Sequence, residues 1–504
     1  MKIEEWIRKI DDLVWGPWLL FLLLGTGIYL MASLRFLPLK NLKFAFGCAL
    51  GRERKGGSGS AEERTPLEAA LPARGRNPGG RGAPYGRHTS AGQNLAAHRG
   101  RSGKKSSGQV SALSSLTTEL AATMGTGNIV GVATAMALGG PGALFWMVVT
   151  SLIGMATKLV ESTLSVTYRS KNELGETVGG PMYTMAAALP GKIPGRVLGF
   201  FFSLFAVLAS FGMGNMTQSN SIADALYVTF QVPKAATALV VTVLTILIVL
   251  GGIGFIAKLT RLMVPFMGIF YLLGTIVVIL AHWKNLPLAI GGIFTAALCP
   301  RAVSGGLFGT VLVSAGQSLR WGVSRGIFSN EAGLGAAGIS AAAADTRDPV
   351  RQGYISMTGV FLDTVVMCSL TGLALAASGA FGMTDEKGAP LTGTALTLAA
   401  FQTTLGDWGE KFISISIVLF AFATIAGWAY QGERAFEFLM KGKTSRNIWY
   451  RFIYALMAFI GCICSLEVVW NLSDICNALM AVPNLVCVLI LSPKVCRQIR
   501  NYRS

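Results

Sequence analysis

The sequence places glycines and polar residues in the middle of an apolar stretch, where they would interrupt a membrane helix. The stretch TELAATMGTGNIVGVATAMALGGPG covers residues 118–142, and its centre holds Gly125, Thr126, Gly127 and Asn128. Unwinding frees carbonyl groups that can coordinate a cation such as Na⁺, and the amides that open a half-helix can hold a carboxylate. Irregular backbone at membrane depth is tolerated only where it lines a cavity or is buried in protein, so these residues are candidate ligands. A tight contact between glycine-bearing helices is the alternative.

A second apolar run is interrupted in a similar way. The run SAGQSLRWGVSRGIFSNEAGLGAAGIS, residues 314–340, contains Gln317, Arg320, Arg325, Asn330 and Glu331. Ionisable groups at membrane depth are costly, and they are usually functional or paired across a helix bundle. Interrupted hydrophobic segments in corresponding positions of two halves point to the binding site of a transporter.

The elements that must position these residues are transmembrane helices. The chain has 504 residues, of which 52% are hydrophobic and only 13% charged, whereas soluble domains carry about 25% charged residues. The apolar runs are continuous, which excludes a β-barrel with its alternating pattern. We expect about eleven spans, at residues 14–34, 112–138, 143–168, 196–227, 235–252, 259–282, 305–342, 354–378, 410–438, 448–466 and 468–492. The run 305–342 is too long and too polar for one plain span, so we expect a second interrupted helix there.

The order of the spans suggests two inverted repeats of five helices, preceded by one extra helix, because the second interrupted span comes five spans after the first. The expected parts are an extra helix (1–34), a basic cytoplasmic loop (35–111), the first repeat (112–282), an extracellular connection (283–304), the second repeat (305–492) and a basic cytoplasmic tail (493–504). The first apolar run follows acidic residues and lacks a cleavage site, so we expect it to be retained rather than removed as a signal peptide.

The net charge of +18 is carried by loops. Lys and Arg gather in alternate connections, which predicts a cytoplasmic C-terminus and an N-terminus outside. The stretch between Gly51 and Gln109 is rich in Gly, Arg, Ser and Pro, and we expect it to be disordered and solvated rather than to bind nucleic acid or anionic lipid. Its flanks GRERKGGSGS and GRSGKKSSGQ resemble each other, so a duplication or a reading-frame artefact in the gene is an alternative to a genuine insert.

Enzymatic classes find no support in the sequence. The eight cysteines are scattered without a CxxC pair, the three histidines form no HExxH motif, and no GxxxxGK[ST] phosphate loop is present. We therefore expect neither an enzyme nor an organic cofactor, and no use of ATP by this chain.

The chain resembles the alanine or glycine:cation symporter family, also called sodium:alanine symporters. The resemblance rests on ELAATMGTGNIVGVATA, GGPGALFWM, GGPMYTM, GNMTQSNSIADAL, LMVPFMGIFY, RGIFSNEAGLG, DPVRQG, GVFLDT, FAFATIAGWAYQGER and NALMAVPNL. It implies an all-α, leucine-transporter-like fold of ten core helices. It also implies uptake of alanine or glycine coupled to Na⁺, or to H⁺, across a prokaryotic plasma membrane. The connection before the first broken helix is about fifty residues longer than this family implies.

The resemblance also implies site residues. Gly125, Thr126, Gly127 and Asn128 would line the amino-acid site. Further lining residues would come from the third core helix, at Gln218, Ser219 and Asn220, and from the eighth, at Thr424 and Trp428. Trp428 would limit the size of the substrate side chain, although simple packing of its ring is the alternative. Na⁺ would lie between first-helix carbonyls from Ala121 to Thr123 and the Thr424 hydroxyl. The family often has a second hydroxyl residue where this chain has Ala423, so one cation ligand is expected to be missing or replaced.

Other ionisable residues lie within the expected spans. Lys158 and Glu161 are three residues apart, so we expect a local pair. Arg325 and Glu331 could form a cytoplasmic gate or a structural salt bridge, and Glu119 could lie near the cytoplasmic entrance. Asp363 has no assigned role beyond a polar network.

Alternatives to alanine or glycine transport remain open at this stage. They are a carrier of another substrate, such as glutamine, threonine or a nucleobase, and an ion channel that uses the GTG backbone as a filter. The sequence indicates neither the oligomeric state nor the number of coupled cations.

Overall fold

The computed structural model describes residues 2–51, 109–299, 302–304, 311–313, 315–385 and 388–502. Nearly all of the Gly/Arg-rich stretch expected to be disordered lies outside these residues. In chain order the elements are α1 (Lys2–Val14), α2 (Pro17–Ser33), α3 (Leu37–Lys40), α4 (Leu42–Ala49), α5 (Ala112–Thr123), η2 (Thr126–Asn128), α6 (Val130–Gly139), α7 (Gly142–Thr167), β1 (Ser170–Lys171), β2 (Thr177–Val178), α8 (Pro181–Ala188), α9 (Lys192–Phe211), η3 (Gly212–Met216), α10 (Thr217–Phe230), α11 (Lys234–Ala281), η4 (Trp283–Asn285), α12 (Leu286–Leu298), β3 (Ala302–Ser304), β4 (Val311–Val313), α13 (Ala315–Asn330), α14 (Ala336–Ala342), α15 (Pro349–Val360), η6 (Phe361–Cys368), α16 (Ser369–Ser378), α17 (Gly393–Leu405), α18 (Asp407–Leu439), η7 (Thr444–Arg446), α19 (Asn447–Ile463) and α20 (Leu466–Arg500).

Seven helices in the described part of the chain are long and apolar enough to cross a membrane. They are Glu5–Ser33, Gly142–Thr167, Ile193–Phe230, Lys234–Ala281, Pro349–Ser378, Asp407–Leu439 and Val468–Arg500. The protein is therefore an all-α membrane protein, as its composition predicts. The exact number of spans stays a prediction, because the two interrupted segments and the 17-residue α19 fall outside this length criterion.

Helix α11 joins two of the expected spans. It runs for 48 residues but contains a sharp kink at Gly252, whose φ is 63°. Glycine reaches this left-handed conformation without the clash that a Cβ atom would cause. The kink therefore separates two helical arms, which correspond to the spans expected at 235–252 and 259–282.

Small residues bring the helices that carry the polar groups close together. A Cβ atom on Gly427 of α18 would lie 2.6 Å from the backbone nitrogen of Ala122 in α5. Such backbone contact favours glycine, because van der Waals packing drives helix association in a bilayer. This close contact places α18 beside the C-terminal end of α5.

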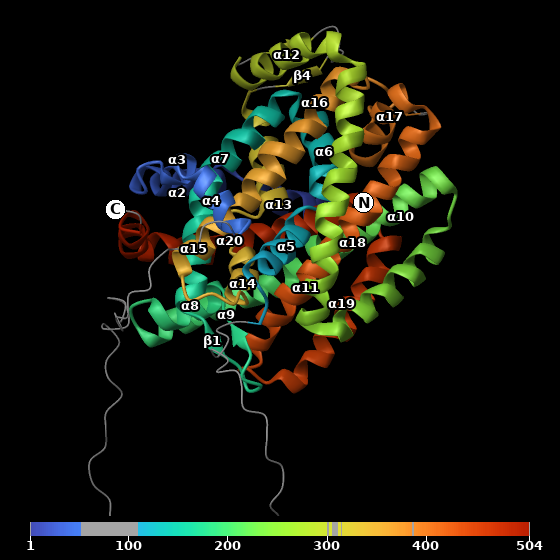
Figure 1. Ribbon diagram of the computed structural model, residues 1–504. Helices are drawn as coiled ribbons and strands as arrows, with labels where there is room; N and C mark the ends of the chain where they lie inside the picture. The colour runs from blue at the N-terminus through green and yellow to red at the C-terminus, as the bar shows by residue number, and fades with distance from the viewer. Residues whose placement is uncertain are drawn as a thin grey trace, which may run out of the picture. The chain divides into compact units, whose positions relative to one another are not determined.

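Short elements mark the two ends of the bundle. Figure 1 shows α12 at one end and the hairpin β1–β2 near the other. Strands β1 and β2 are antiparallel, with Ser170 opposite Val178 and Lys171 opposite Thr177. The short helices α8, α12 and α17 were not expected from the sequence. Helix α12 falls in the region assigned to a plain connection.

Candidate functional site

The first interruption occurs where the glycines predict it. Helix α5 ends at Thr123, the single 3₁₀ turn η2 follows, and α6 starts at Val130. A Cβ atom on Gly125 would lie 2.3 Å from the Thr424 hydroxyl oxygen, and one on Gly127 would lie 3.2 Å from the Ser329 Cα. The glycines therefore let the unwound backbone approach both α18 and α13 closely.

Gln218 meets the first interruption, as predicted. Its Oε1 accepts hydrogen bonds from the Thr126 amide at 3.1 Å and the Thr126 hydroxyl at 2.9 Å. Its Nε2 donates to the Met213 carbonyl in the π-helical turn η3 at 2.9 Å. The amide side chain thus ties the unwound turn to the helix formed by α9, η3 and α10.

Asn220 does not meet the interruption, so its predicted orientation is wrong. Its Nδ2 donates to the carbonyls of Gly461 and Cys464, both at 2.9 Å, at the junction of α19 and α20. Gln218 and Asn220 are two residues apart and point to different sides of the helix. Ser219 also turns away and donates to Asn215 Oδ1 at 3.1 Å.

Two of the oxygens expected around Na⁺ lie together. The Thr424 hydroxyl donates to the Ala121 carbonyl at 3.0 Å. The Thr123 carbonyl, the other expected ligand, accepts a hydrogen bond from the Gly125 amide at 2.8 Å. The pair of Ala121 carbonyl and Thr424 hydroxyl suits a hard cation that prefers oxygen. Ala423 is buried and adds no hydroxyl.

The second interruption is also present. Helix α13 ends at Asn330 and α14 starts at Ala336. Between them Glu331, Gly333 and Gly335 have φ values of 58°, 96° and 82°. Left-handed backbone at a non-glycine residue such as Glu331 is uncommon, and the surrounding structure must hold the residue in this conformation.

Trp428 connects α18 to the second interruption. Its indole Nε1 donates to Glu331 Oε1 at 2.8 Å, and both side chains are fully buried. A Cβ atom on Gly214 would lie 2.5 Å from the Trp428 side chain, so the ring packs directly against the backbone of η3. The ring is held by packing on one side and by a hydrogen bond to a buried carboxyl group on the other.

Asp363 joins the two interruptions, which the sequence analysis missed. Its carboxylate accepts from Asn128 Nδ2 at 2.9 Å, from the Ser329 hydroxyl at 2.7 Å and from the Thr364 hydroxyl at 2.8 Å. Asn128 belongs to the first interruption and Ser329 to the end of α13. The available signal was a single acidic residue inside the apolar segment GVFLDT.

The buried lysine of α7 has a different partner from the one predicted. Lys158 Nζ lies 3.5 Å from Glu119 Oε1 and donates to the Asn330 carbonyl at 2.9 Å. Glu161 instead accepts from Asn484 Nδ2 at 2.5 Å. Glu119 is 1% exposed, so it does not line an open entrance. Lys158 thereby links α5 to the end of α13.

Arg325 and Glu331 do not pair, because each has another partner. Arg325 donates to both carboxylate oxygens of Asp474 in α20, at 3.0 and 2.6 Å. Its guanidinium also lies over the Trp470 ring, 4.7 Å from the centroid. The direct contact expected between Arg325 and Glu331, as a gate or as a structural salt bridge, is therefore not formed. A bidentate, buried pair between α13 and α20 takes its place.

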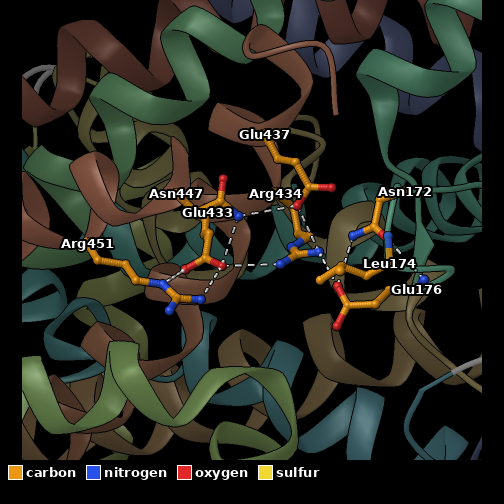
Figure 2. A network of polar contacts seen from close by, with 8 residues as sticks. All are labelled: Asn172, Leu174, Glu176, Glu433, Arg434, Glu437, Asn447 and Arg451. Carbon is orange, nitrogen blue, oxygen red and sulfur yellow. Dashed lines mark hydrogen bonds and ion pairs between the residues drawn. The ribbon is translucent and has the colours of Figure 1, made fainter. Parts of the chain in front are cut away.

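A second buried arginine lies near the β1–β2 hairpin. Arg434 of α18 contacts Glu176, Glu437 and Glu433 at 3.0, 2.9 and 3.2 Å. Figure 2 shows how Arg451 and Asn447 from α19 extend this network through Glu433. Glu176 comes from the hairpin, whereas the other five residues come from α18 and α19.

Both interruptions are closed off from solvent. Thr126 and Asn128 are fully buried, and Thr424 is 1% exposed. The structure therefore brings Gly125, Thr126, Gln218 and Thr424 together on one side of the first interruption. Asn128 instead contacts Asp363, and Trp428 contacts the second interruption.

Known proteins are similar to this chain in sequence and in architecture. The model of the sodium:alanine symporter family matches residues 90–504. The sodium/alanine symporter AgcS of Methanococcus maripaludis is 40% identical, over 100% of this chain and 98% of its own. The probable sodium/glutamine symporter GlnT of Bacillus subtilis is 32% identical, over 99% of this chain and 91% of its own.

A solved structure shares the fold. The crystal structure of MhsT in complex with L-phenylalanine aligns with a TM-score of 0.50 at 13% sequence identity, covering 78% of this chain and 98% of MhsT. This likeness confirms the leucine-transporter-like fold, and the relatives confirm a membrane transporter rather than an enzyme. The chain belongs to the sodium:alanine symporter family.

Proposed function

We propose that the protein couples the entry of Na⁺ to the uptake of alanine or glycine by alternating access. The proposal rests mainly on one structural observation. Two interrupted helices meet inside an apolar bundle, and their polar groups are buried against Gln218, Asp363, Thr424 and Trp428. Buried polar groups at membrane depth are expensive and mark substrate and ion pathways.

The amino acid would bind at the first interruption. Its carboxylate would meet the amides of the unwound segment from Gly125 to Asn128, and its ammonium would meet oxygen acceptors. Trp428 would stand over the side chain, since it is fixed between Gly214 and Glu331. A rigid ring at this place favours a side chain no larger than methyl or hydrogen. Asn220 is not part of this site.

Na⁺ would bind between the Ala121 carbonyl and the Thr424 hydroxyl, which are 3.0 Å apart. Backbone carbonyls toward Thr123 would complete its shell. The cation would join the end of α5 to α18 and hold the unwound segment in shape for the amino acid. H⁺ is the alternative coupling ion.

Two charged contacts would close the site from its two sides. The Arg325–Asp474 pair lies on the α13 side of the second interruption, and the Arg434 network lies at the β1–β2 hairpin. Basic connections predict that the hairpin side faces the cytoplasm, with the N-terminus outside and the C-terminus inside a prokaryotic plasma membrane. Arg325 would then belong to an outer gate rather than to the cytoplasmic gate expected from the sequence.

Binding measurements test the proposal. Purified protein should bind alanine more tightly in Na⁺ than in choline, and alanine should raise Na⁺ affinity by the same factor, because coupling is reciprocal. Equal alanine affinity in Na⁺, Li⁺ and choline would refute Na⁺ coupling.

Glutamine is the second candidate substrate. The sodium/glutamine relative, at 32% identity over nearly the whole chain, supports it. Competition of labelled alanine uptake by glycine, glutamine and threonine separates the two candidates. Strong inhibition by glutamine and none by glycine would select the second.

A further inference from the structure

A basic cavity opens at the hairpin end of the bundle, away from the two interruptions. Its volume is about 430 Å³, and its walls come from β1, α8, α9 and the turn after α18. Three basic side chains line it: Lys171, Arg196 and Lys441. Three aromatic side chains, Tyr183, Phe200 and Phe438, also line it.

Among the described residues, the positive charges of the three basic residues are not paired with acidic side chains. All three are exposed, none has an ion pair in the described part of the chain, and no carboxylate lines the cavity. The nearest acids of the Figure 2 network, Glu176 and Glu437, are already bound by Arg434 at 3.0 and 2.9 Å. A cavity with three free cations and neutral walls selects an anion.

The cavity also has an apolar side that continues along a membrane helix. Tyr183 and Phe438 pack edge to face with ring centroids 5.0 Å apart. Phe200 of α9 lines the cavity and is 48% exposed, and Val197 beside it is also 48% exposed. Because α9 belongs to the apolar span Ile193–Phe230, these exposed side chains face lipid.

The position of the cavity matches the level of lipid headgroups. Arg196 and Phe200 lie in the first turns of the span that begins at Ile193, and Lys441 follows the end of the span Asp407–Leu439. In the proposed orientation the hairpin end faces the cytoplasm. Basic pockets between helices on the cytoplasmic side are known sites for anionic lipid headgroups. Inorganic phosphate would satisfy the cations but would leave the aromatic wall unused.

We propose that this basic cavity binds the headgroup of an anionic phospholipid, with an acyl chain lying along the exposed face of α9. The headgroup would bridge Lys171 on the hairpin to Lys441 beside α18. The Glu176–Arg434 pair already joins the same two elements. Bound lipid therefore stabilises the arrangement in which the hairpin is held against α18.

Native mass spectrometry of the purified full-length protein tests the proposal. The protein is equilibrated with phosphatidylglycerol or with phosphatidylcholine of the same acyl chains, and bound lipid is counted. We expect the wild type to prefer phosphatidylglycerol by about tenfold or more, since each basic residue near an anionic headgroup adds about fivefold. The variant K171Q/R196Q/K441Q should lose this preference.

A matched variant separates the cavity from general charge. K258Q/R261Q/K494Q removes three exposed basic residues elsewhere and should keep the preference. K171R/R196K/K441R keeps the cavity charge and should also keep it. If the triple glutamine variant does not fold, the single variants K171Q, R196Q and K441Q should each show a partial loss.

Three outcomes would overturn the proposal. They are a wild type without preference for the anionic lipid, equal losses in the cavity variant and the matched variant, and displacement of bound phosphatidylglycerol by millimolar inorganic phosphate. The last outcome would assign the cavity to a soluble anion.

Discussion

Two buried arginines, on either side of the interrupted helices, are neutralised in different ways. Arg325 is 3% exposed, and among the described residues it forms an ion pair with Asp474 alone, which is 2% exposed. Arg434 is 8% exposed and shares three acids, Glu176, Glu433 and Glu437. The first contact is one bidentate pair backed by aromatic rings, and the second is a network.

The difference predicts different costs of opening. Parting α13 from α20 leaves Arg325 and Asp474 both without a partner, which is strongly unfavourable in a buried site. Moving the hairpin away from α18 removes the Glu176 carboxylate from Arg434, but Arg434 keeps Glu433 and Glu437 on its own helix. The Arg325 pair should therefore act as an all-or-none contact, and the Arg434 network as a graded one.

Arg325→Gln should produce the largest effect. It leaves Asp474 buried and unpaired, and the expected loss of stability is about 3–5 kcal/mol. Alanine uptake should fall to background. Thermal unfolding in detergent and uptake at equal membrane expression measure the two effects.

The double variant R325Q/D474N is the control for this change. It removes both charges and should recover part of the lost stability, though not the gating function. Unchanged stability and uptake in Arg325→Gln would show that the pair is not an obligatory contact.

Trp428→Phe tests the region between the two arginines. The aromatic packing is largely kept, but Glu331 loses its indole donor, and leaving a buried acceptor without a partner costs about 1–3 kcal/mol. Alanine affinity should fall by about tenfold or more. Trp449→Phe, at a Trp that is 66% exposed on α19, is the matched control and should leave affinity unchanged. An equal effect of both variants on alanine affinity would show that Trp428 has no specific role in the binding site.

Thr424→Val tests the contact between α18 and the helix that ends at the first interruption. The loss of the hydroxyl removes the contact to the Ala121 carbonyl, at a cost of about 1 kcal/mol. The Na⁺ concentration for half-maximal uptake should rise about fivefold. Thr424→Ser keeps the hydroxyl and should behave as wild type. Unchanged Na⁺ dependence in Thr424→Val would place the cation elsewhere.

The interruptions were predictable from the sequence because they depend on local residue types. Gly125 and Gly127 weaken the helix at the first interruption, and the length and polarity of the run 305–342 indicated the second. The family motifs then supplied Thr424 and Trp428.

The partners of charged residues were not predictable in the same way. Arg325 meets Asp474 across 149 positions in the chain, and Asp363 joins two helices that are far apart in sequence. Spacing along one helix suggested Lys158 with Glu161, but helix packing brought Glu119 to the lysine instead. Local spacing also could not show that Gln218 and Asn220 point to different helices.

Glu176→Gln should produce the smallest effect and tests the graded character of the Arg434 network directly. Glu176 is 32% exposed, and ion pairs at such positions contribute about 0–1 kcal/mol. Arg434 keeps its two partners on α18, so uptake should fall by less than about fivefold. Hydrogen exchange should increase in the hairpin, residues 170–178, because its contact to α18 is weakened. Glu173→Gln, an exposed change on the same hairpin, should alter neither measurement. If Glu176→Gln instead abolished uptake as Arg325→Gln should, the two arginines would act alike and the network would be a single obligatory contact.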